Sequence, residues 1–94
     1  MRELYCGSRI LIDSSGAALV CRYFILVRTV TEPICFESYG VRIVVSGTGE
    51  QAEAPDLTVY SDRIEALSYL LLRGGVTPCA LKDVVSDWLL LPPV

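Results

Sequence analysis

The fold is decided by residues 57–73, LTVYSDRIEALSYLLLR, where the spacing of the apolar residues changes from two to about 3.6. Before Ser61 the apolar residues alternate as in a half-buried strand, and after it they recur at helical spacing. This change predicts a helix over about 62–73 with a buried stripe of Ile64, Leu67, Leu70 and Leu71. Ser61 or Asp62 is expected to cap the helix, and Gly74 to follow its end.

Upstream of this point the chain reads as a series of strands rich in β-branched and aromatic residues. The predicted strands are residues 4–12, 17–30, 34–45 and 56–60. DSSG at 13–16 is a turn sequence, and SGTGEQAEAP at 46–55 reads as a loop. We therefore expect a single α+β domain over 1–94, an antiparallel three- to four-stranded β-meander followed by two C-terminal helices packed on one sheet face.

Downstream, VTPCALKDVVSDWLL predicts a second helix over about 78–90, capped by Thr77 and ended by Pro92 and Pro93. Its predicted buried face consists of Leu81, Val84, Val85 and Trp88. The two helices have the spacing of a DNA-binding helix-turn-helix, so the exposed face of the second helix decides whether DNA can bind. That face carries Lys82, Asp83, Ser86 and Asp87. Its net negative charge would repel phosphate, so we expect a packing unit that does not bind DNA.

Composition bounds the remaining functions. Hydrophobic residues make up 52% of the 94 residues and charged residues 20%, which is typical of a folded domain. A formal charge of −3 disfavours non-specific binding to nucleic acid or to an anionic membrane. The apolar runs are too short to span a bilayer, and the N-terminal residues lack the apolar run of a secretion signal. We expect a cytoplasmic protein with no membrane partner.

The residue types available restrict the chemistry. The chain has no histidine, and its four cysteines, Cys6, Cys21, Cys35 and Cys79, form no CxxC pair. We therefore expect no metal, no cofactor and no catalytic residue, with the thiols reduced and buried. One alternative is a thiol-dependent enzyme using Cys79, because the first turn of a helix favours a thiolate and Lys82 lies one turn on.

Several segments between residues 20 and 91 resemble a family of short, uncharacterised Firmicutes proteins that carry a domain of unknown function. The segments are YFILVR, ESYGVRIVV and the C-terminal pattern V-x-P-x-x-L-x-D-V-V-x-D-x-L, matched by Val76, Pro78, Leu81, Asp83, Val84, Val85, Asp87 and Leu89. A histidine common in that family is replaced here by Ala80, so any site that uses this imidazole would be missing. The resemblance implies a bacterial, cytoplasmic, small α+β domain and no particular activity.

The predicted strand phasing places one distinctive set of side chains on the sheet face away from the helices. If Ile12 opposes Ala17, odd residues of the first strand share this face with even residues of the next two. The face then holds Arg9, Arg22, Arg28 and Arg42, together with Phe24, Leu26 and Phe36. No carboxylate of the predicted strands falls on it, Arg22 is expected to oppose Arg42, and Ile10 is expected to face the helices.

Two helices cover only one side of a sheet, so these apolar and arginine side chains should be exposed. Arginine and aromatic residues are frequent anchors of protein interfaces. We therefore interpret the chain as a non-catalytic interaction module that binds itself or an acidic protein through Arg9, Arg22, Phe24, Leu26, Arg28, Phe36 and Arg42. The main alternative is single-stranded RNA binding, because arginines and aromatics on a sheet can stack bases.

Overall fold

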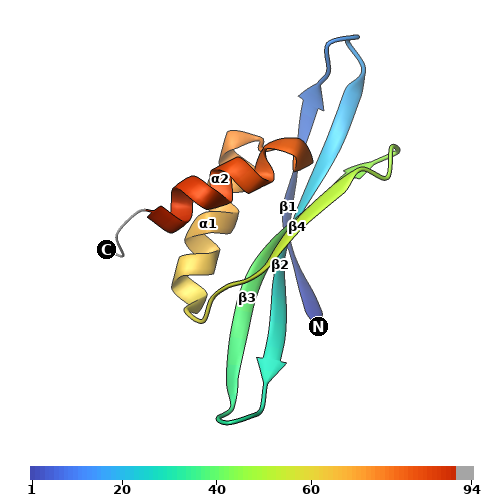
Figure 1. Cartoon of the computed structure of the whole chain (residues 1–94). Helices are drawn as coiled ribbons and strands as arrows, with labels where there is room; N and C mark the ends of the chain where they lie inside the picture. The colour runs from blue at the N-terminus through green and yellow to red at the C-terminus, as the bar shows by residue number, and fades with distance from the viewer. Residues whose placement is uncertain (91–94) are drawn as a thin grey trace.

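The computed structural model describes residues 1–90 and shows a four-stranded antiparallel sheet followed by two helices (Figure 1). In chain order the elements are β1 (Arg2–Ile12), β2 (Ala18–Val30), β3 (Phe36–Ser46), β4 (Gln51–Thr58), α1 (Ser61–Gly74) and α2 (Pro78–Leu90). Strands that are adjacent in the sequence are adjacent in the sheet, in the order β1-β2-β3-β4. The predicted α+β meander is therefore confirmed.

The sheet extends further than the helices that cover it. The β1–β2 hairpin projects beyond the helices at one end of the molecule, and the β2–β3 turn projects at the other (Figure 1). The radius of gyration is 14.0 Å, compared with about 12 Å for a compact domain of this length. The principal extents are 50 × 27 × 17 Å. Long stretches of strand consequently have no helix over either face.

The DSSG turn forms as expected and is organised by Asp13. Its Oδ1 accepts hydrogen bonds from the backbone N–H groups of Ser15 and Ala17, both at 2.9 Å. Hydrogen bonds from the Ser15 side chain and from these backbone groups lower the pKa of the Asp13 carboxyl. Because Asp13 N also donates to Ala17 O at 3.0 Å, the loop closes one residue later than predicted, and Ile12 opposes Ala18.

The predicted fourth strand is present, but its predicted bounds of 56–60 were wrong, since β4 runs from Gln51 to Thr58. A tight turn in which Val45 N donates to Glu50 O at 2.8 Å places the next residues beside β3. The segment QAEA has low intrinsic strand propensity, so its pairing with a central strand overrides local preference. The third strand also begins later than predicted, at Phe36, after a bend that contains a cis peptide bond before Pro33.

The core lies between one face of the sheet and the two helices. On the sheet side it is formed by alternating residues of β2 and β3, as expected for strands with one buried face. The buried cluster consists of Cys21, Tyr23, Ile25, Val27, Val41, Ile43, Val45, Ile64, Leu67, Leu71, Leu81, Val85 and Trp88. Both helices contribute to this cluster, so they hold the same face of the sheet.

The ends of α1 differ from those predicted. The N-cap residue is Tyr60, and no side chain caps the helix, so the prediction of a Ser61 or Asp62 cap was wrong. At the other end Gly75, not Gly74, adopts the left-handed conformation, with φ 61°, and its N–H faces the last carbonyl groups of the helix. Leu70 was also misassigned: it is 48% exposed, and Ser68 is buried on the helix face that packs on the sheet.

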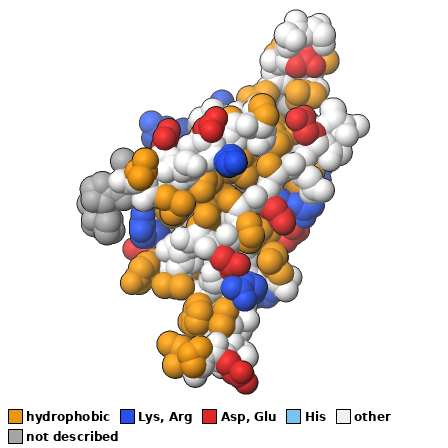
Figure 2. Space-filling model, viewed as in Figure 1, with side chains coloured by type: hydrophobic (Ala, Val, Ile, Leu, Met, Phe, Trp, Pro, Cys, Tyr) orange, Lys and Arg blue, Asp and Glu red, His pale blue; other side chains and the backbone are white. Residues whose placement is uncertain are grey.

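The second helix has the expected bounds, with Pro78 at its first position, and it buries Pro78, Leu81, Val85 and Trp88. The predicted end signal at residues 92–93 lies outside the described residues. The guanidinium carbon of Arg63 lies 4.8 Å from the centroid of the Trp88 ring, a cation–π contact between the helices. In the view of Figure 2, acidic and basic side chains are interspersed among hydrophobic ones.

Tyr23 links the sheet to the α1–α2 connection. Its hydroxyl donates a hydrogen bond of 2.8 Å to Val76 O, and only 1% of the residue is exposed. Burial raises the pKa of the Tyr23 phenol from 10.0 to about 12. The neutral phenol is therefore the form that the folded state favours.

This shift predicts an alkaline dependence of stability that Tyr23→Phe removes. Below pH 10 the wild type should be more stable than the variant by about 1–2 kcal/mol, because of the hydrogen bond. The raised folded-state pKa means that this advantage is complete below the unfolded pKa and declines as pH rises from about 10 to about 12. Urea unfolding of both proteins at several pH values measures the difference, in which other titrating groups cancel. A difference that does not change with pH would contradict the assignment.

Candidate functional site

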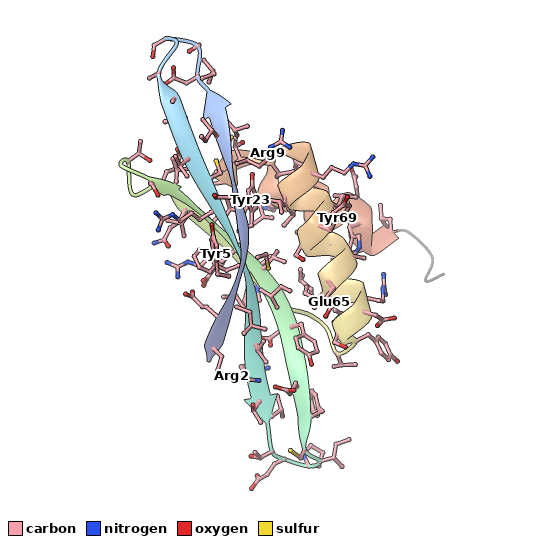
Figure 3. All side chains as sticks on the ribbon, turned by 180° about the vertical axis from the view of Figure 1, so that it is seen from behind. Arg2, Tyr5, Arg9, Tyr23, Glu65 and Tyr69 are labelled. Carbon is pink, nitrogen blue, oxygen red and sulfur yellow. The ribbon has the colours of Figure 1, made fainter. Side chains whose placement is uncertain are left out.

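Both helices pack on one face of the sheet, and the opposite face, called the outer face below, carries the even-numbered residues of β2 and β3. Near its centre the rings of Tyr5 and Phe24 are in contact, with centroids 5.6 Å apart and planes tilted by 59°. Figure 3 shows Tyr5 pointing away from the helices. Tyr5 is 60% exposed, whereas Phe24, which the sequence predicted to be exposed, is half-buried.

A β-bulge divides β1 into two halves. Tyr5 opposes Phe24 but Gly7 opposes Tyr23, so Cys6 is an extra residue in the strand. Its effect is to reverse the inward and outward alternation of every later residue in β1. The second half of the strand therefore faces opposite to the phase that simple alternation assigns.

Because of this reversal, the predicted site residue Arg9 lies on the helix face of the sheet and not on the outer face. It pairs with Cys21 of the core face, and its Nη1 donates a hydrogen bond of 3.2 Å to Arg73 O at the end of α1. Figure 3 shows it on the helix side of β1. Ile10 and Ile12 move in the opposite sense, onto the outer face, where they are 69% and 67% exposed.

Gly7 is the sequence signal that could have revealed the bulge, because an isolated glycine inside a strand pattern often marks one. Its φ of +152° lies outside the range that side-chain-bearing residues favour. A Cβ at this position would also lie 3.0 Å from Leu72 Cδ2 of α1. The glycine therefore permits both the bulge and the close approach of the helix.

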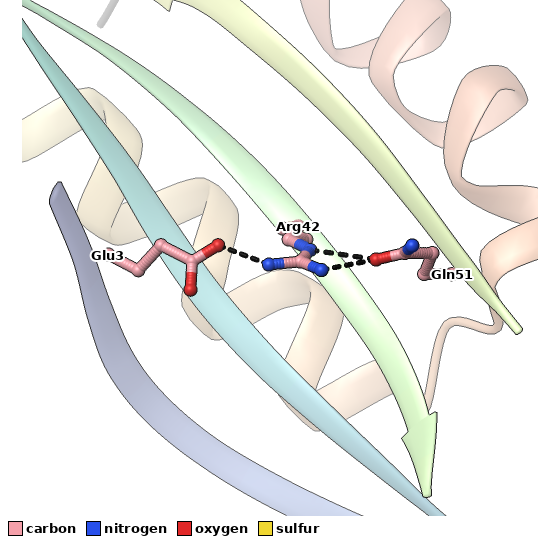
Figure 4. A network of polar contacts seen from close by, with 3 residues as sticks. All are labelled: Glu3, Arg42 and Gln51. Atoms are coloured by element: carbon pink, nitrogen blue, oxygen red, sulfur yellow. Dashed lines mark hydrogen bonds and ion pairs between the residues drawn. The ribbon is translucent and has the colours of Figure 1, made fainter. Parts of the chain in front are cut away.

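Arg42 lies at the centre of a polar network that crosses the outer face (Figure 4). Its Nη1 donates to Glu3 of β1, while its Nε donates to Gln51 Oε1 of β4 at 3.1 Å and its Nη2 donates to the same oxygen. The expectation that this face lacks carboxylates was wrong, because β1 begins at Arg2 and so includes Glu3. The charge of Arg42 is thus already paired within the chain.

Arg28 is likewise paired. Its Nε donates to Asp56 Oδ1 at 2.9 Å, and hydrogen bonds from Arg28 and Ser38 lower the pKa of the Asp56 carboxyl. Asp56 follows Pro55 in β4 and has a φ of 55°. Phe36, another predicted site residue, is half-buried. It opposes Val30 beside the β2–β3 turn, at the end of the sheet away from Ile10 and Ile12 in the β1–β2 hairpin.

Arg22 is the exception among the outer-face arginines. It opposes Val44, while Arg42 opposes Phe24, so the predicted Arg22–Arg42 pair was wrong. The difference arises because β2 and β3 pair two residues away from the assumed register. Arg22 is exposed, and within residues 1–90 no carboxylate lies within ion-pair distance of it.

Leu26 lies on the outer face as expected, but it is only 2% exposed, so the prediction of a docking role for it was wrong. Its cross-strand neighbours are Glu3 and Gly40. The ion pair between Glu3 and Arg42 spans β2 diagonally between Leu26 and Phe24, since each charged residue opposes one of these two. The chain's own side chains therefore cover Leu26.

Glu37, by contrast, lies on the helix face of the sheet, beyond the end of the helices. It opposes Thr29 and forms an ion pair with Arg2, which opposes Val27 on the same face. Both partners are substantially exposed. This pair accounts for a carboxylate on the buried side of the sheet, because the sheet extends past its helical cover there.

The surface that remains open on the outer face is narrower than predicted and is displaced toward the β1–β2 hairpin. We call it the outer-face patch, defined as Tyr5, Ile10, Ile12, Val20, Arg22, Phe24 and Val44. Its defining residues are apolar apart from Arg22, and Ser8 lies among them on the same face. The two isoleucines are its most exposed apolar members. Arg22, Phe24 and Arg42 do lie together, as predicted, whereas Arg28 and Phe36 lie toward the other end of the sheet.

The cysteines are all free, but their burial differs from that predicted. Cys21 is buried and Cys6 is half-buried, and burial raises the pKa of both thiols. Cys35 and Cys79 are exposed, so the expectation that all four pack in the core was wrong for these two. Cys79 Sγ lies 3.3 Å from Thr77 Oγ1.

Two properties of the described part of the chain bear on other classes of function. Residues 1–90 contain no group of three or more His, Cys, Asp or Glu side chains placed to hold a metal ion. Neither of the helices in the same range has the length and apolarity needed to cross a membrane.

Comparison with known proteins identifies one relationship. A family model described as "Family of unknown function (DUF6514)" matches residues 2–91, nearly the whole chain. No curated protein and no solved structure matches the sequence significantly. The match begins well before the segments from which the resemblance to an uncharacterised family was drawn, and it includes the bulged first strand.

Proposed function

We propose that this chain, which belongs to the family of unknown function DUF6514, is a non-catalytic protein-interaction module that binds its partner through the outer-face patch. The single observation that carries the proposal is that this patch is mostly apolar, with Arg22 and Ser8 as its polar residues, and is uncovered by any helix of the described residues. Sheets with one solvated face usually alternate apolar and polar residues so that the wet side is polar. The outer face near the hairpin departs from that pattern.

The composition of the patch favours a protein partner. The rings of Tyr5 and Phe24 are in tilted contact, and Ile10 and Ile12 expose aliphatic side chains that do not contribute to the chain's own core. Clustered apolar side chains on a soluble domain commonly mark contacts with other proteins. Arg22, whose guanidinium has no carboxylate partner among residues 1–90, supplies an anchor of the type enriched at interface centres.

The pairing of the other arginines weakens the acidic-partner and RNA alternatives. Arg28 and Arg42 are neutralised by Asp56 and Glu3, and Arg9 is on the opposite face. Binding of a nucleic-acid backbone relies on free cations that replace condensed counterions. The patch has one arginine without a carboxylate partner among residues 1–90, and the chain has a net charge of −3. Apolar contact therefore contributes more to the proposed binding than electrostatic attraction does.

Site-specific photo-crosslinking tests the proposal. A benzophenone amino acid in place of Tyr5, introduced in the native host, should yield a discrete adduct with a protein that mass spectrometry identifies. The same probe in place of Tyr69 is the matched control, because that tyrosine is 62% exposed on α1 against 60% for Tyr5. The proposal predicts adducts at position 5 that are at least several-fold more abundant than at position 69.

Each result is decisive. A specific protein adduct at position 5, whether with another protein or a second copy, supports an interaction module. Equal or absent crosslinking at the two positions would overturn the proposal, and an adduct with RNA at position 5 would replace it by the RNA-binding alternative.

A further inference from the structure

Within residues 1–90, no strand pairs with the outer side of the β1 backbone. β1 pairs with β2 on one side only, so it is an edge strand from Arg2 to Ile12, and β4 is the edge strand on the other side of the sheet. Edge strands present unpaired N–H and C=O groups that can accept a further strand. Proteins that remain monomeric usually obstruct such edges.

The edge at β4 is obstructed in several ways. Pro55 provides no N–H, and the left-handed Asp56 interrupts the extended backbone. The helix α2 packs along this strand. The second half of β1, GSRILI at 7–12, has no proline and only one charged residue. α1 packs on its helix-side face at Gly7 and Arg9, and the end of the strand continues beyond the helices in Figure 1. The two edges therefore differ in how readily they can accept a strand.

The hydrogen-bonding direction along β1 follows from the turn that ends it. Asp13 N donates to Ala17 O, so Asp13 directs its backbone groups toward β2. These directions alternate along an antiparallel strand, and the residues at 9 and 11 share the direction of Asp13. The N–H and C=O groups of Ser8, Ile10 and Ile12 consequently point to the open side.

We propose that a second copy of the chain pairs with this edge in antiparallel register about a two-fold axis at Ile10, joining two sheets into one of eight strands. The inference rests on the proposed function, because it identifies a second copy as one partner and uses Ile10 and Ile12 of the outer-face patch. Ile10 would then oppose its own equivalent, and Ser8 would oppose Ile12 of the second copy.

This register satisfies the requirements of a continuous sheet. A two-fold axis perpendicular to the sheet keeps outer face beside outer face, and Ser8, Ile10 and Ile12 all lie on that face. The residues that oppose each other, Ser8, Ile10 and Ile12, all direct their backbone N–H and C=O groups to the open edge, so these groups of the two copies can form hydrogen bonds with each other. On the helix side Arg9 opposes Leu11 of the second copy, so the two Arg9 side chains are diagonal neighbours and not directly opposed.

This pairing joins the outer-face patches of the two copies into one surface. Each patch ends at Ile10 and Ile12 on the edge strand, so pairing at that edge places the two patches side by side. An interface limited to so short a strand buries much less than the about 800 Å² per partner of a standard complex. We therefore expect a dimer that dissociates in the micromolar range and that is best observed at high protein concentration.

Sedimentation equilibrium tests the self-association. Wild-type protein at several hundred micromolar should contain a large dimer fraction. Ile10→Pro should reduce it at least tenfold, because the outward N–H is lost while the bonds to β2 remain. Ile10→Val is the matched control that keeps both the N–H and a β-branched side chain, and it should remain within about twofold of the wild type. Circular dichroism establishes that each variant is folded.

Disulfide trapping tests the register without relying on a proline. In a background with Cys35→Ser and Cys79→Ser, Ile10→Cys should oxidise rapidly to a covalent dimer. Opposed residues of a hydrogen-bonded antiparallel pair lie about 5.5 Å apart at Cα, within the disulfide range. Ile12→Cys is the matched control, because the two equivalent residues would be about 13 Å apart along the strands and should not crosslink.

The outcomes separate this inference from the proposed function. A wild type that stays monomeric at these concentrations, or crosslinking at position 12 equal to that at position 10, would overturn the edge pairing. Crosslinking to another protein from Tyr5 would in that case still support the interaction module. If edge pairing is observed but no protein adduct forms at Tyr5, the proposed use of the patch fails while the dimer stands.

Discussion

Replacing Gly40 by alanine is expected to destabilise the protein by about 3 kcal/mol, at the upper end of the usual cost of overpacking. Gly40 is buried in β3, where Ala54 and Pro55 of β4 cross directly over it. A Cβ added there would lie 2.6 Å from Pro55 Cα and closer still to Ala54 O. Both obstacles are backbone atoms, so no rotamer change relieves the clash, and β4 must move away from β3.

Urea unfolding monitored by circular dichroism measures this loss, and Gly74→Ala is the control. Gly74 lies in the last turn of α1, where an added Cβ would meet only Val76 Cγ2 at an ordinary 3.7 Å. Alanine should stabilise the protein there by about 0.5–1 kcal/mol, because it restricts the unfolded chain and favours the helix. A Gly40→Ala variant as stable as the wild type would show that β4 is not held against β3 at this point.

Truncation of Leu67 to alanine is the second substitution with a large expected effect, a loss of about 3–4 kcal/mol. Leu67 is fully buried (0% exposed) at the centre of the α1 face that packs on the sheet. Its removal costs the transfer free energy of the lost methyl groups and leaves a cavity that the strands below cannot fill. Differential scanning calorimetry should show a correspondingly lower Tm.

Leu70→Ala provides the matched comparison on the same helix. Leu70 is 48% exposed, so the same chemical change should cost about 1 kcal/mol or less. Similar losses at the two positions would contradict the orientation of α1. The comparison is informative because the sequence pattern assigned both leucines to the same buried stripe.

The helical half of the protein could be predicted closely from the sequence, because its signals are local. Pro78 fits only the first turn of a helix, and Trp88 and Leu81 recur at helical spacing. The assignment of Leu70 failed because a stripe defined by spacing alone does not show which edge of it the neighbouring elements cover. Ser68, a polar residue, is buried at the other edge of the stripe, against β1.

The sheet was predictable in topology but not in register. The turn at Asp13 and the β-branched runs specify three strands, whereas QAEA becomes a strand only because β3 is available beside it. The ion pairs of Arg42 and Arg28 could not be predicted, since they join residues from strands whose limits were misjudged. The placement of Arg9 depended on whether β1 contained one extra residue, which alternation cannot reveal.

That extra residue at Cys6 has a consequence for reading related sequences. In a strand without an inserted residue, all odd-numbered residues face one side of the sheet and all even-numbered residues face the other along its whole length. The inserted residue shifts the phase midway, so Leu4 and Leu11, of opposite parity, both face inward while Tyr5 and Ile10 both face outward. In a relative with one residue fewer here, one half of the strand would face the opposite side of the sheet. The presence or absence of that single position in an alignment would distinguish the two arrangements.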